Sequence, residues 1–315
     1  MDMNVPHAIL QIPENHSGWG SRIIGEPANE NIEWSFSPQL RVYFDQEQRA
    51  MWSRWNPQPR PCFNPRLLAD IKRYYDFLAH GEANIQRSGQ GGAVEYVVLA
   101  SATPDVFNLG GDLDLFKQSI ETRDREGLLN YGRACIEVLY RNYVGHDLHA
   151  TTISLVQGEC LGGGFEAALS SDVIVAEKKA RFGFPEILFN LFPGMGAYSF
   201  LKRKVGQKIT EELIGSGKIY SVDDMLALGV VDVVAEDGQG EAEVASFIKH
   251  RQKNRNGFTS LAWVRRRVDR IEYAELLDIV DLWVDSALRL NPRDLKLMQR
   301  LVSRQNGVGD SQQVH

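Results

Sequence analysis

The sequence has little of three features that would assign it to particular classes of protein. Its 35 lysines and arginines are outnumbered by 41 aspartates and glutamates, giving a net charge of −6 and a pI near 5.7. Nucleic-acid-binding proteins usually need a basic surplus, so we expect no nucleic-acid partner. No apolar run is long enough for a transmembrane span, and the first twenty residues lack a signal-peptide pattern, so we expect no membrane insertion. The three cysteines, Cys62, Cys135 and Cys160, are too few and too scattered for a disulfide framework, which predicts a cytoplasmic protein.

What the sequence contains is the composition of an ordinary folded protein. Hydrophobic residues make up 43% and charged residues 24% of its 315 positions, and no internal repeat or low-complexity block is present. The first thirty residues show little periodicity, whereas helical patterns dominate from about residue 198. We therefore divide the chain into an irregular N-terminal arm (1–30), a core (31–240) and a helical C-terminal region (241–315).

Apolar strand patterns alternate with helical patterns in the core. The run VEYVVLAS at 94–101 is almost continuously apolar, which is typical of a strand covered on both faces. Shorter strands at 153–158 and 172–177 each follow a helical pattern, and this rhythm predicts an α/β fold with parallel strands. The other predicted elements are a strand at 32–43 interrupted by Pro38, a helix at 60–79 with Asn64 as cap and Pro65 at its first position, and helices at 124–145, 164–171, 198–216, 222–228 and 260–304.

Three segments of the core combine glycines with carboxylates. They are VFNLGGDLDLF (106–116) with Gly110, Gly111 and Asp112, VQGECLGGGFEAALSSD (156–172) with Gly162, Gly163, Gly164 and Glu166, and RFGFPEILFNLFPGMGAYSFL (181–201) with Glu186 after Pro185. Glycines at a strand-to-helix turn let backbone N–H groups approach a ligand, and the first N–H groups of a helix have no intrahelical acceptor. Two such turns could supply two N–H donors to one oxygen, the arrangement that stabilises an enolate or a tetrahedral oxyanion.

Each of these features also has a purely structural explanation. A triple glycine can serve only as a tight turn, and Asp112 can serve as a helix cap or turn former. Glu166 and Glu186 can be acidic residues favoured near helix starts. Glycines and glutamates taken one at a time therefore do not establish a catalytic site.

Several other kinds of site are disfavoured by what the motifs lack. Cys160 fits a small buried residue, because no histidine lies near it in the sequence to activate it. His146 and His149 are three residues apart, but no further ligand completes a metal site, so we expect no metal. The absence of G-x-G-x-x-G and of G-x-S-x-G argues against a dinucleotide cofactor and against a serine hydrolase.

Taken together, the three segments resemble a known family. The run from Gly158 to Leu201 is similar to the crotonase (enoyl-CoA hydratase/isomerase) superfamily in its GGG-x-E helix start and in its F-G-x-P-E and P-G-x-G patterns. Asn64 in CFNPRLL, the Gly110-Gly111-Asp112-Leu113 turn and LGVVDVV at 228–234 resemble further family motifs, so the resemblance covers residues 60 to 235. VFNLGGDLDLF, LGGGFEAALS and VDSALRL are similar to one branch, the bacterial diffusible signal factor synthases.

The resemblance implies a fold and a set of site residues. It implies a ββα spiral core and C-terminal helices that form a homo-oligomer, most often a trimer. It places Gly111 and Gly163 where the family has the N–H donors of its oxyanion hole. It places Glu166 and Glu186 on the paired catalytic glutamates, and the presence of both favours hydration or dehydration over isomerisation. No cofactor is implied beyond the phosphopantetheine that carries the substrate.

The resemblance also implies a substrate class and a reaction. Members of the signal factor branch dehydrate 3-hydroxyacyl thioesters to a cis-2-enoyl chain and release the free fatty acid. The acyl group is carried by acyl carrier protein or CoA, and LDLFKQSIETRDRE at 113–126 lacks a clear adenine-binding pattern, which favours the carrier protein. The alternatives are a plain enoyl-CoA hydratase/isomerase without thioesterase activity, and a homologue that binds a signalling partner such as a two-component sensor.

Two groups of side chains are candidates for contacts with partners. Four basic clusters could dock an acidic carrier protein, although each also fits an ordinary solvated face: Lys178, Lys179 and Arg181; Lys202, Arg203 and Lys204; Arg251, Lys253 and Arg255; and Arg265, Arg266 and Arg267. Apolar residues of the C-terminal helices exceed what a lone helix needs and could join copies of the chain: Trp263, Leu276, Ile279, Trp283 and Leu288.

Overall fold

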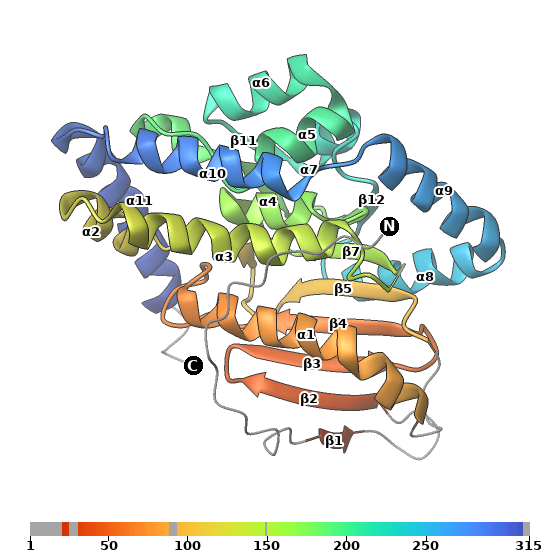
Figure 1. Cartoon of the computed structure of the whole chain (residues 1–315). Coiled ribbons are helices and arrows are strands. Elements are labelled where there is room, and N and C mark those ends of the chain that lie inside the picture. Colours follow the sequence, from red (N-terminus) through yellow and green to blue (C-terminus); the bar gives the residue numbers. More distant parts are fainter. Residues whose placement is uncertain (1–20, 25–30, 88–92, 149, 311–315) are drawn as a thin grey trace.

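The computed structural model describes residues 21–24, 31–87, 93–148 and 150–310, and its strands form two sheets (Figure 1). The larger sheet has, in spatial order, β1 (Ser21–Ile24), β2 (Asn31–Ser37), β3 (Leu40–Asp45), β4 (Ala50–Trp55), β5 (Tyr96–Ser101), β7 (Thr151–Val156), β9 (Val173–Glu177) and β12 (Val233–Ala235). The smaller sheet has β11 (Ile219–Ser221), β10 (Arg181–Gly183), β8 (Glu159–Leu161) and β6 (Val106–Asn108). From β4 to β12 the neighbours of the larger sheet pair in parallel.

Successive repeats of the spiral each contribute one strand to the larger sheet and one to the smaller sheet. β5 is followed by β6, β7 by β8 and β9 by β10, and the first strand of each pair lies in the larger sheet. The helices are α1 (Pro65–Arg87), α2 (Leu113–Glu121), α3 (Arg125–Tyr143), α4 (Gly163–Leu169), the 3₁₀ helix η1 (Pro185–Phe189), α5 (Ala197–Val205), α6 (Gln207–Ser216), α7 (Val222–Ala227), α8 (Gly240–Gln252), α9 (Arg255–Val268), α10 (Tyr273–Ala287) and α11 (Pro292–Asp310). The predicted α/β fold with a ββα spiral core is confirmed.

Side chains of β5 alternate between two apolar clusters, one on each face of the larger sheet. Val97 and Leu99 belong to the main core, which also holds side chains of α1 and α3. Val98 lies in a second cluster with Val244 and Ile248 of α8. Burial on both faces explains why this strand is a continuous apolar run in the sequence, as we predicted.

Helix α1 begins as the sequence predicts. Asn64 Oδ1 accepts a hydrogen bond from the N–H of Leu67 at 2.8 Å, and Pro65 is the first helical residue. The helix continues beyond the predicted end at residue 79, to Arg87. It packs along β2 and β3 on one side and along α3 on the other (Figure 1).

The boundaries of several predicted elements were wrong for identifiable reasons. Pro38 does not interrupt one strand but lies in the tight turn between the antiparallel strands β2 and β3. The helix expected at 198–216 is two helices, because Gly206 adopts a φ of +80° between them. The pattern at 260–304 is divided among α9, α10 and α11. Part of the arm expected to be irregular forms β1, and the loop expected at 88–92 lies outside the described residues.

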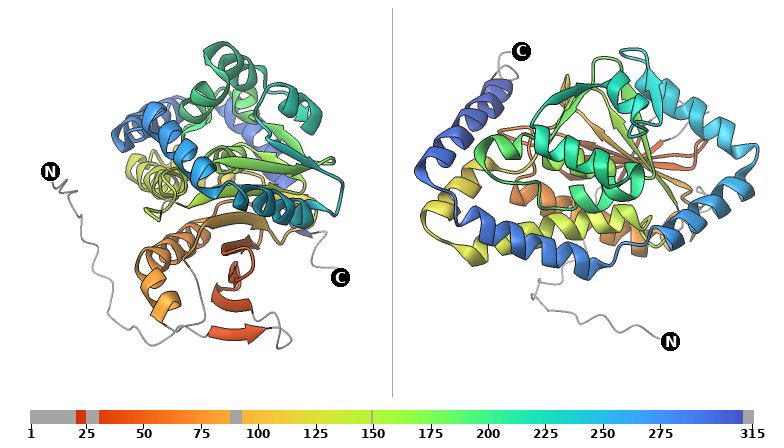
Figure 2. Two further views of the ribbon diagram at one scale, coloured as in Figure 1. Left: turned by 90° about the vertical axis from the view of Figure 1, so that its right-hand side faces the viewer. Right: turned by 90° about the horizontal axis from the view of Figure 1, so that it is seen from above.

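The C-terminal helices run along the outside of the core and supply part of its packing (Figure 2). Helix α10 packs against α3, and α11 packs against α2 and η1. Leu276 and Trp283 of α10 are therefore buried within the chain, so their assignment to an interface between copies was wrong. Among the described helices, none is long and apolar enough to cross a membrane.

Candidate active site

The two glycine turns lie against each other at the ends of neighbouring strands. β6 and β8 are parallel neighbours, so the turns that follow them leave the smaller sheet at the same edge. A Cβ atom on Gly110 would lie only 3.0 Å from the nitrogen of Gly163 and 3.1 Å from the carbonyl oxygen of Leu161. Gly110 also has a φ of +96°, which other residues rarely adopt. Glycine at this position therefore permits the close approach of the two turns.

The N–H groups of Gly111 and Gly163 are left available at this junction. The neighbouring amides are occupied: the N–H of Gly110 donates to Asn108 Oδ1 at 2.8 Å and that of Asp112 to the Tyr131 hydroxyl at 3.3 Å. In the described part of the chain the N–H of Gly111 has no such acceptor. Gly163 is the first residue of α4, where an N–H has no intrahelical acceptor, and both glycines line the same pocket.

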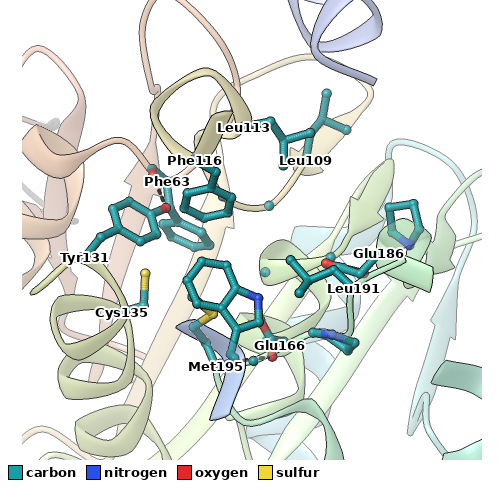
Figure 3. Close-up of a pocket in the computed structure, with 18 of the residues that line it drawn as sticks. Phe63, Leu109, Leu113, Phe116, Tyr131, Cys135, Glu166, Glu186, Leu191 and Met195 are labelled. Carbon is teal, nitrogen blue, oxygen red and sulfur yellow. Dashed lines mark hydrogen bonds between the residues drawn. The ribbon is translucent and has the colours of Figure 1, made fainter. Parts of the chain in front are cut away.

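Glu166 lies in the first turns of α4 and points into this pocket (Figure 3). Its side chain is almost fully buried, with a relative exposure of 1%. Its Oε1 atom accepts hydrogen bonds from the N–H groups of Met195 at 2.8 Å and Ala197 at 3.0 Å. Burial raises the pKa of Glu166 to about 7, although the two N–H donors act in the opposite direction.

Glu186 reaches the same pocket from η1 (Figure 3). Its carboxyl group lies against the glycine turn, since a Cβ atom on Gly162 would be 2.5 Å from Glu186 Oε1. Its Oε2 atom is buried and has no hydrogen-bond partner among the described residues. Desolvation, followed by the nearby charge of Glu166, raises the pKa of Glu186 to about 8.

The two carboxyl groups line the same pocket but have different surroundings. Glu166 accepts two N–H donors, which stabilise its ionised form, whereas Glu186 lacks such donors for Oε2. Near neutral pH the pair can therefore hold one proton, preferentially on Glu186. Such a pair can accept a proton at one atom of a ligand and donate a proton at another.

The pocket around these groups is largely apolar and has about 670 Å³ of unfilled space, part of it open to solvent. Figure 3 shows Phe63, Tyr131 and Cys135 on one side and Glu186 and Leu191 on the other. Its apolar and aromatic lining residues are Phe63, Leu68, Leu109, Leu113, Phe116, Tyr131, Val138, Leu139, Phe189, Leu191, Met195 and Trp283. A ligand with an acyl chain next to a polar carbonyl group matches this lining.

Sequence reasoning missed several residues that shape the site. Tyr131 of α3 donates a hydrogen bond to the carbonyl oxygen of Phe63 at 2.5 Å, and its hydroxyl also accepts the N–H of Asp112. Trp283 of α10 forms part of the pocket wall. Tyr131 lies 19 positions after Asp112, and Trp283 lies much farther along the chain in α10. The helical spacing of both residues indicates only burial, so no local signal identified them.

Other residues singled out from the sequence have structural roles here. Asp112 caps α2, accepting the N–H of Leu115 at 3.3 Å, and pairs with Arg60 at 2.9 Å. Cys160 is fully buried, as expected of a small core residue. His146 is buried away from the pocket lining, and His149 lies outside the described residues. No cluster of three or more His, Cys, Asp or Glu side chains suited to a metal occurs among the residues described.

Comparison with known protein families gives a match over most of the core. The sequence model of the Enoyl-CoA hydratase/isomerase family matches residues 85–268. The fatty acid oxidation complex subunit alpha of Pseudomonas savastanoi pv. phaseolicola is 32% identical over 152 residues, which are 48% of this chain and 20% of that protein. The corresponding subunit of Pseudomonas paraeruginosa is 32% identical over 157 residues, 50% of this chain and 21% of that protein. This chain thus matches about a fifth of the length of these relatives.

Solved structures share the fold at low sequence identity. The enoyl-CoA hydratase of Mycobacterium avium subsp. paratuberculosis is 18% identical, with a TM-score of 0.66 over 85% of this chain and 97% of that one. Human mitochondrial delta3-delta2-enoyl-CoA isomerase is 17% identical, with a TM-score of 0.66 over 84% and 97%. Pseudomonas aeruginosa DspI is 20% identical, with a TM-score of 0.55 over 78% and 80%.

Proposed function

The chain belongs to the enoyl-CoA hydratase/isomerase family, and from this premise we propose that it dehydrates 3-hydroxyacyl thioesters. The observation that carries the proposal is the arrangement of Glu166 and Glu186, two carboxyl groups with raised pKa values, beside two available N–H groups in one apolar pocket. In this proposal the N–H groups of Gly111 and Gly163 bind the thioester carbonyl oxygen. Glu166 and Glu186 are the catalytic residues.

The reaction is an elimination across the α- and β-carbons. The two N–H donors stabilise the enolate that forms as the α-proton leaves, and this lowers the barrier to its removal. Glu166, the carboxylate of the pair, accepts the α-proton, and Glu186 donates its proton to the β-hydroxyl. The C–O bond breaks, water departs and a double bond forms between the two carbons. The two N–H donors to Glu166 and the buried, unpartnered Oε2 atom of Glu186 support this division of roles.

We further propose that the product is a cis-2-enoyl chain and that the same site hydrolyses the thioester to release the free fatty acid. A water molecule would attack the thioester carbonyl carbon, the two N–H groups would stabilise the tetrahedral oxyanion, and the thiol would leave with a proton. The segments that resemble the diffusible signal factor synthases support this finer assignment. It requires no metal or redox cofactor, and the substrate is carried by the phosphopantetheine of acyl carrier protein or CoA.

Mass spectrometry of the products from 3-hydroxyacyl-carrier protein and from 3-hydroxyacyl-CoA tests the assignment. Free unsaturated acid is the expected product, and the carrier that gives the higher kcat/KM identifies the natural thioester. An equilibrium of hydrated and unsaturated thioesters without free acid would instead identify the plain enoyl-CoA hydratase. If neither substrate reacts, the proposed dehydration is overturned and the alternative is a homologue that binds a signalling partner, a function against which the two pocket glutamates argue.

Most side chains of the basic clusters considered for carrier docking make contacts within the chain. Arg265 and Arg266 both pair with Asp172 at 2.5 Å, and Arg203 pairs with Glu275 at 2.9 Å. The other intramolecular contacts include Lys178 with Glu236, Lys179 with Asp105, Lys204 with Asp232, Arg255 with Glu95, and Arg251 over the rings of Phe247 and Phe258. These contacts involve part of each cluster, and the choice of carrier rests on the assay with both thioesters.

We expect a bell-shaped dependence of kcat/KM on pH, with apparent pKa values near 7 and near 8. Below the first value Glu166 is protonated and cannot accept the α-proton, and above the second Glu186 loses the proton that it donates. Initial rates between about pH 5.5 and 9.5 measure the profile. A profile that is flat across this range would contradict the acid and base roles.

We also propose that the chain forms a homotrimer. Helix α9 has no fully buried residue and exposes Leu261, Val264 and Val268 at 63%, 57% and 75%, together with Trp263 at 47%. An apolar helix face of this kind is typical of an interface between copies. Light scattering at micromolar concentration should give three times the mass of one chain, and Val264→Asp with Val268→Asp should shift the mass to one chain. A monomeric wild-type protein would overturn this assignment.

A further inference from the structure

The C-terminal helix α11 reaches both halves of the candidate site. It runs beside α2, the helix that begins directly after the Gly110-Gly111 turn (Figures 1 and 2). Near its start, Asp294 Oδ2 accepts a hydrogen bond from Asn190 Nδ2 at 3.2 Å, and Asn190 ends the 3₁₀ helix that carries Glu186. Farther along, Gln305 reaches the glycine turn itself.

Gln305 donates hydrogen bonds to two carbonyl oxygens of this turn. Its Nε2 atom lies 3.0 Å from the oxygen of Leu109 and 3.4 Å from that of Gly111. Carbonyl oxygens can only accept, so the end of the amide that faces them is the NH₂ group. Its Oε1 atom is buried and has no partner among the described residues. The hydrogen bonds of this side chain within the described structure therefore all go to one turn.

Gln305 occupies a position at which the helical spacing predicts an apolar residue. Leu295, Met298, Val302 and Gln305 follow one another at intervals of three, four and three residues, so they share a face of α11. Met298 and Val302 are fully buried, and Gln305 is only 4% exposed. Burying an amide costs free energy unless it is hydrogen-bonded, and one of its two polar ends is not. Apolar packing thus does not explain this residue.

The contacts of Gln305 flank the peptide group that carries the Gly111 N–H. That peptide joins Gly110 to Gly111, and its own carbonyl oxygen accepts the N–H of Phe63 at 2.8 Å. The carbonyl groups of the peptides before and after it are the two that Gln305 holds. Gly110 has a φ of +96° and lacks a Cβ, so the turn by itself resists rotation of these peptides only weakly. Gln305 and Phe63 together fix three successive carbonyl groups.

We propose that Gln305 is a positioning residue that keeps the Gly111 N–H directed at the thioester carbonyl oxygen. The inference rests on the proposed function, because the role of that N–H is proposed there. In the described structure Gln305 is not among the residues that line the pocket, so it acts through the turn rather than on the acyl chain. We therefore expect Gln305 to stabilise the enolate rather than to strengthen binding of the ground-state substrate.

The first test compares Gln305→Met with Val302→Ala. Met keeps the length and the apolar fit of the side chain but removes its NH₂ group. We expect kcat to fall about tenfold and KM to change less than about threefold. Tm should also fall, because the carbonyl oxygens of Leu109 and Gly111 lose their donor, a cost that removal of the unpaired Oε1 atom only partly offsets. Val302→Ala leaves a cavity on the same face of α11 and keeps Gln305, so it should lower Tm while kcat stays near that of the wild type.

The second test measures enolate stabilisation without turnover. Acetoacetyl-CoA is a 3-oxoacyl thioester whose enolate absorbs in the near ultraviolet, so the pH at which the bound ligand ionises can be titrated. We expect wild-type protein to lower the apparent pKa of the ligand, and Gln305→Met to raise it by about one unit relative to wild type, while Val302→Ala matches wild type.

The outcomes separate this inference from the proposed function. If wild-type protein lowers the pKa of the ligand and Gln305→Met does so equally, with unchanged kcat, Gln305 is only a structural residue and the inference is overturned. If Val302→Ala loses as much kcat as Gln305→Met at a similar fall in Tm, the loss reflects stability alone and the inference is likewise overturned. If wild-type protein itself does not favour the bound enolate, the oxyanion site fails, and the positioning role fails with it.

Discussion

Glu166→Gln and Glu186→Gln should each lower kcat at least about 100-fold with 3-hydroxyacyl thioester substrates. The amide of glutamine matches the carboxyl group in shape but can neither accept nor donate the proton in this reaction. Each variant also retains the other glutamate and both N–H donors of the oxyanion site, so KM should change much less than kcat. Steady-state kinetics at pH 7.5 measures both parameters. Glu212→Gln, a change at an exposed residue of α6, is the matched control and should keep wild-type kcat.

The same variants separate a catalytic role from a structural one through the pH dependence of stability. The pKa of Glu186 in the folded protein is about 8, above its ordinary value of 4.5, so folding favours the protonated form. The stabilisation is fully present below pH 4.5 and is lost as pH rises through 8. Wild-type Tm should therefore fall more between pH 6 and 9 than the Tm of Glu186→Gln, which has no proton to lose at this position. If Glu186→Gln is inactive and its Tm at pH 9 equals or exceeds that of the wild type, Glu186 has a catalytic role. Full activity in either glutamine variant excludes the acid–base pair.

The parts of the fold that sequence predicted are those governed by local chemistry. Asn64 and Pro65 mark the start of α1 because a cap and a first-turn proline act through neighbouring backbone atoms. The apolar run of β5 predicted burial on both faces because every residue of a covered strand contacts a core. Helix ends were less predictable, since the break at Gly206 depends on a positive φ that the sequence only permits.

The candidate site shows the same division between local and distant information. Gly111, Gly163, Glu166 and Glu186 lie in segments with recognisable patterns, and the structure brings all four to one pocket. Gln305 contacts the glycine turn from 194 positions away along the chain. Tyr131 and Trp283 likewise reach the site from helices whose spacing indicates only burial. A local sequence pattern does not predict which turn a buried helix face will contact, so these supporting residues could be identified only from the structure.

Gly110→Ala should lower kcat about 100-fold or more, although the substitution removes no N–H group. Its Cβ atom would lie 3.0 Å from the Gly163 nitrogen and 3.1 Å from the Leu161 oxygen, both backbone atoms that cannot move independently. The facing backbone must therefore move by a few tenths of an ångström, and alanine at a φ of +96° adds backbone strain. Both effects displace the two N–H donors from the geometry in which they meet one oxygen. Loss of one oxyanion donor typically costs a factor of about 10² to 10³ in kcat, so a displaced pair should cost at least as much as the lower figure.

Two further alanine variants isolate this effect from backbone strain and from added bulk. Gly206 has a similar positive φ of +80° but open space around its missing Cβ, so Gly206→Ala should lower Tm and leave kcat near that of the wild type. A Cβ on Gly163 would make only ordinary contacts of 3.4 Å or more with the facing turn, so Gly163→Ala should lower kcat less than about tenfold. Near-UV circular dichroism confirms that each variant is folded before kinetics are measured. A folded Gly110→Ala protein with the kcat of Gly206→Ala would mean that the closeness of the two turns has no role in catalysis.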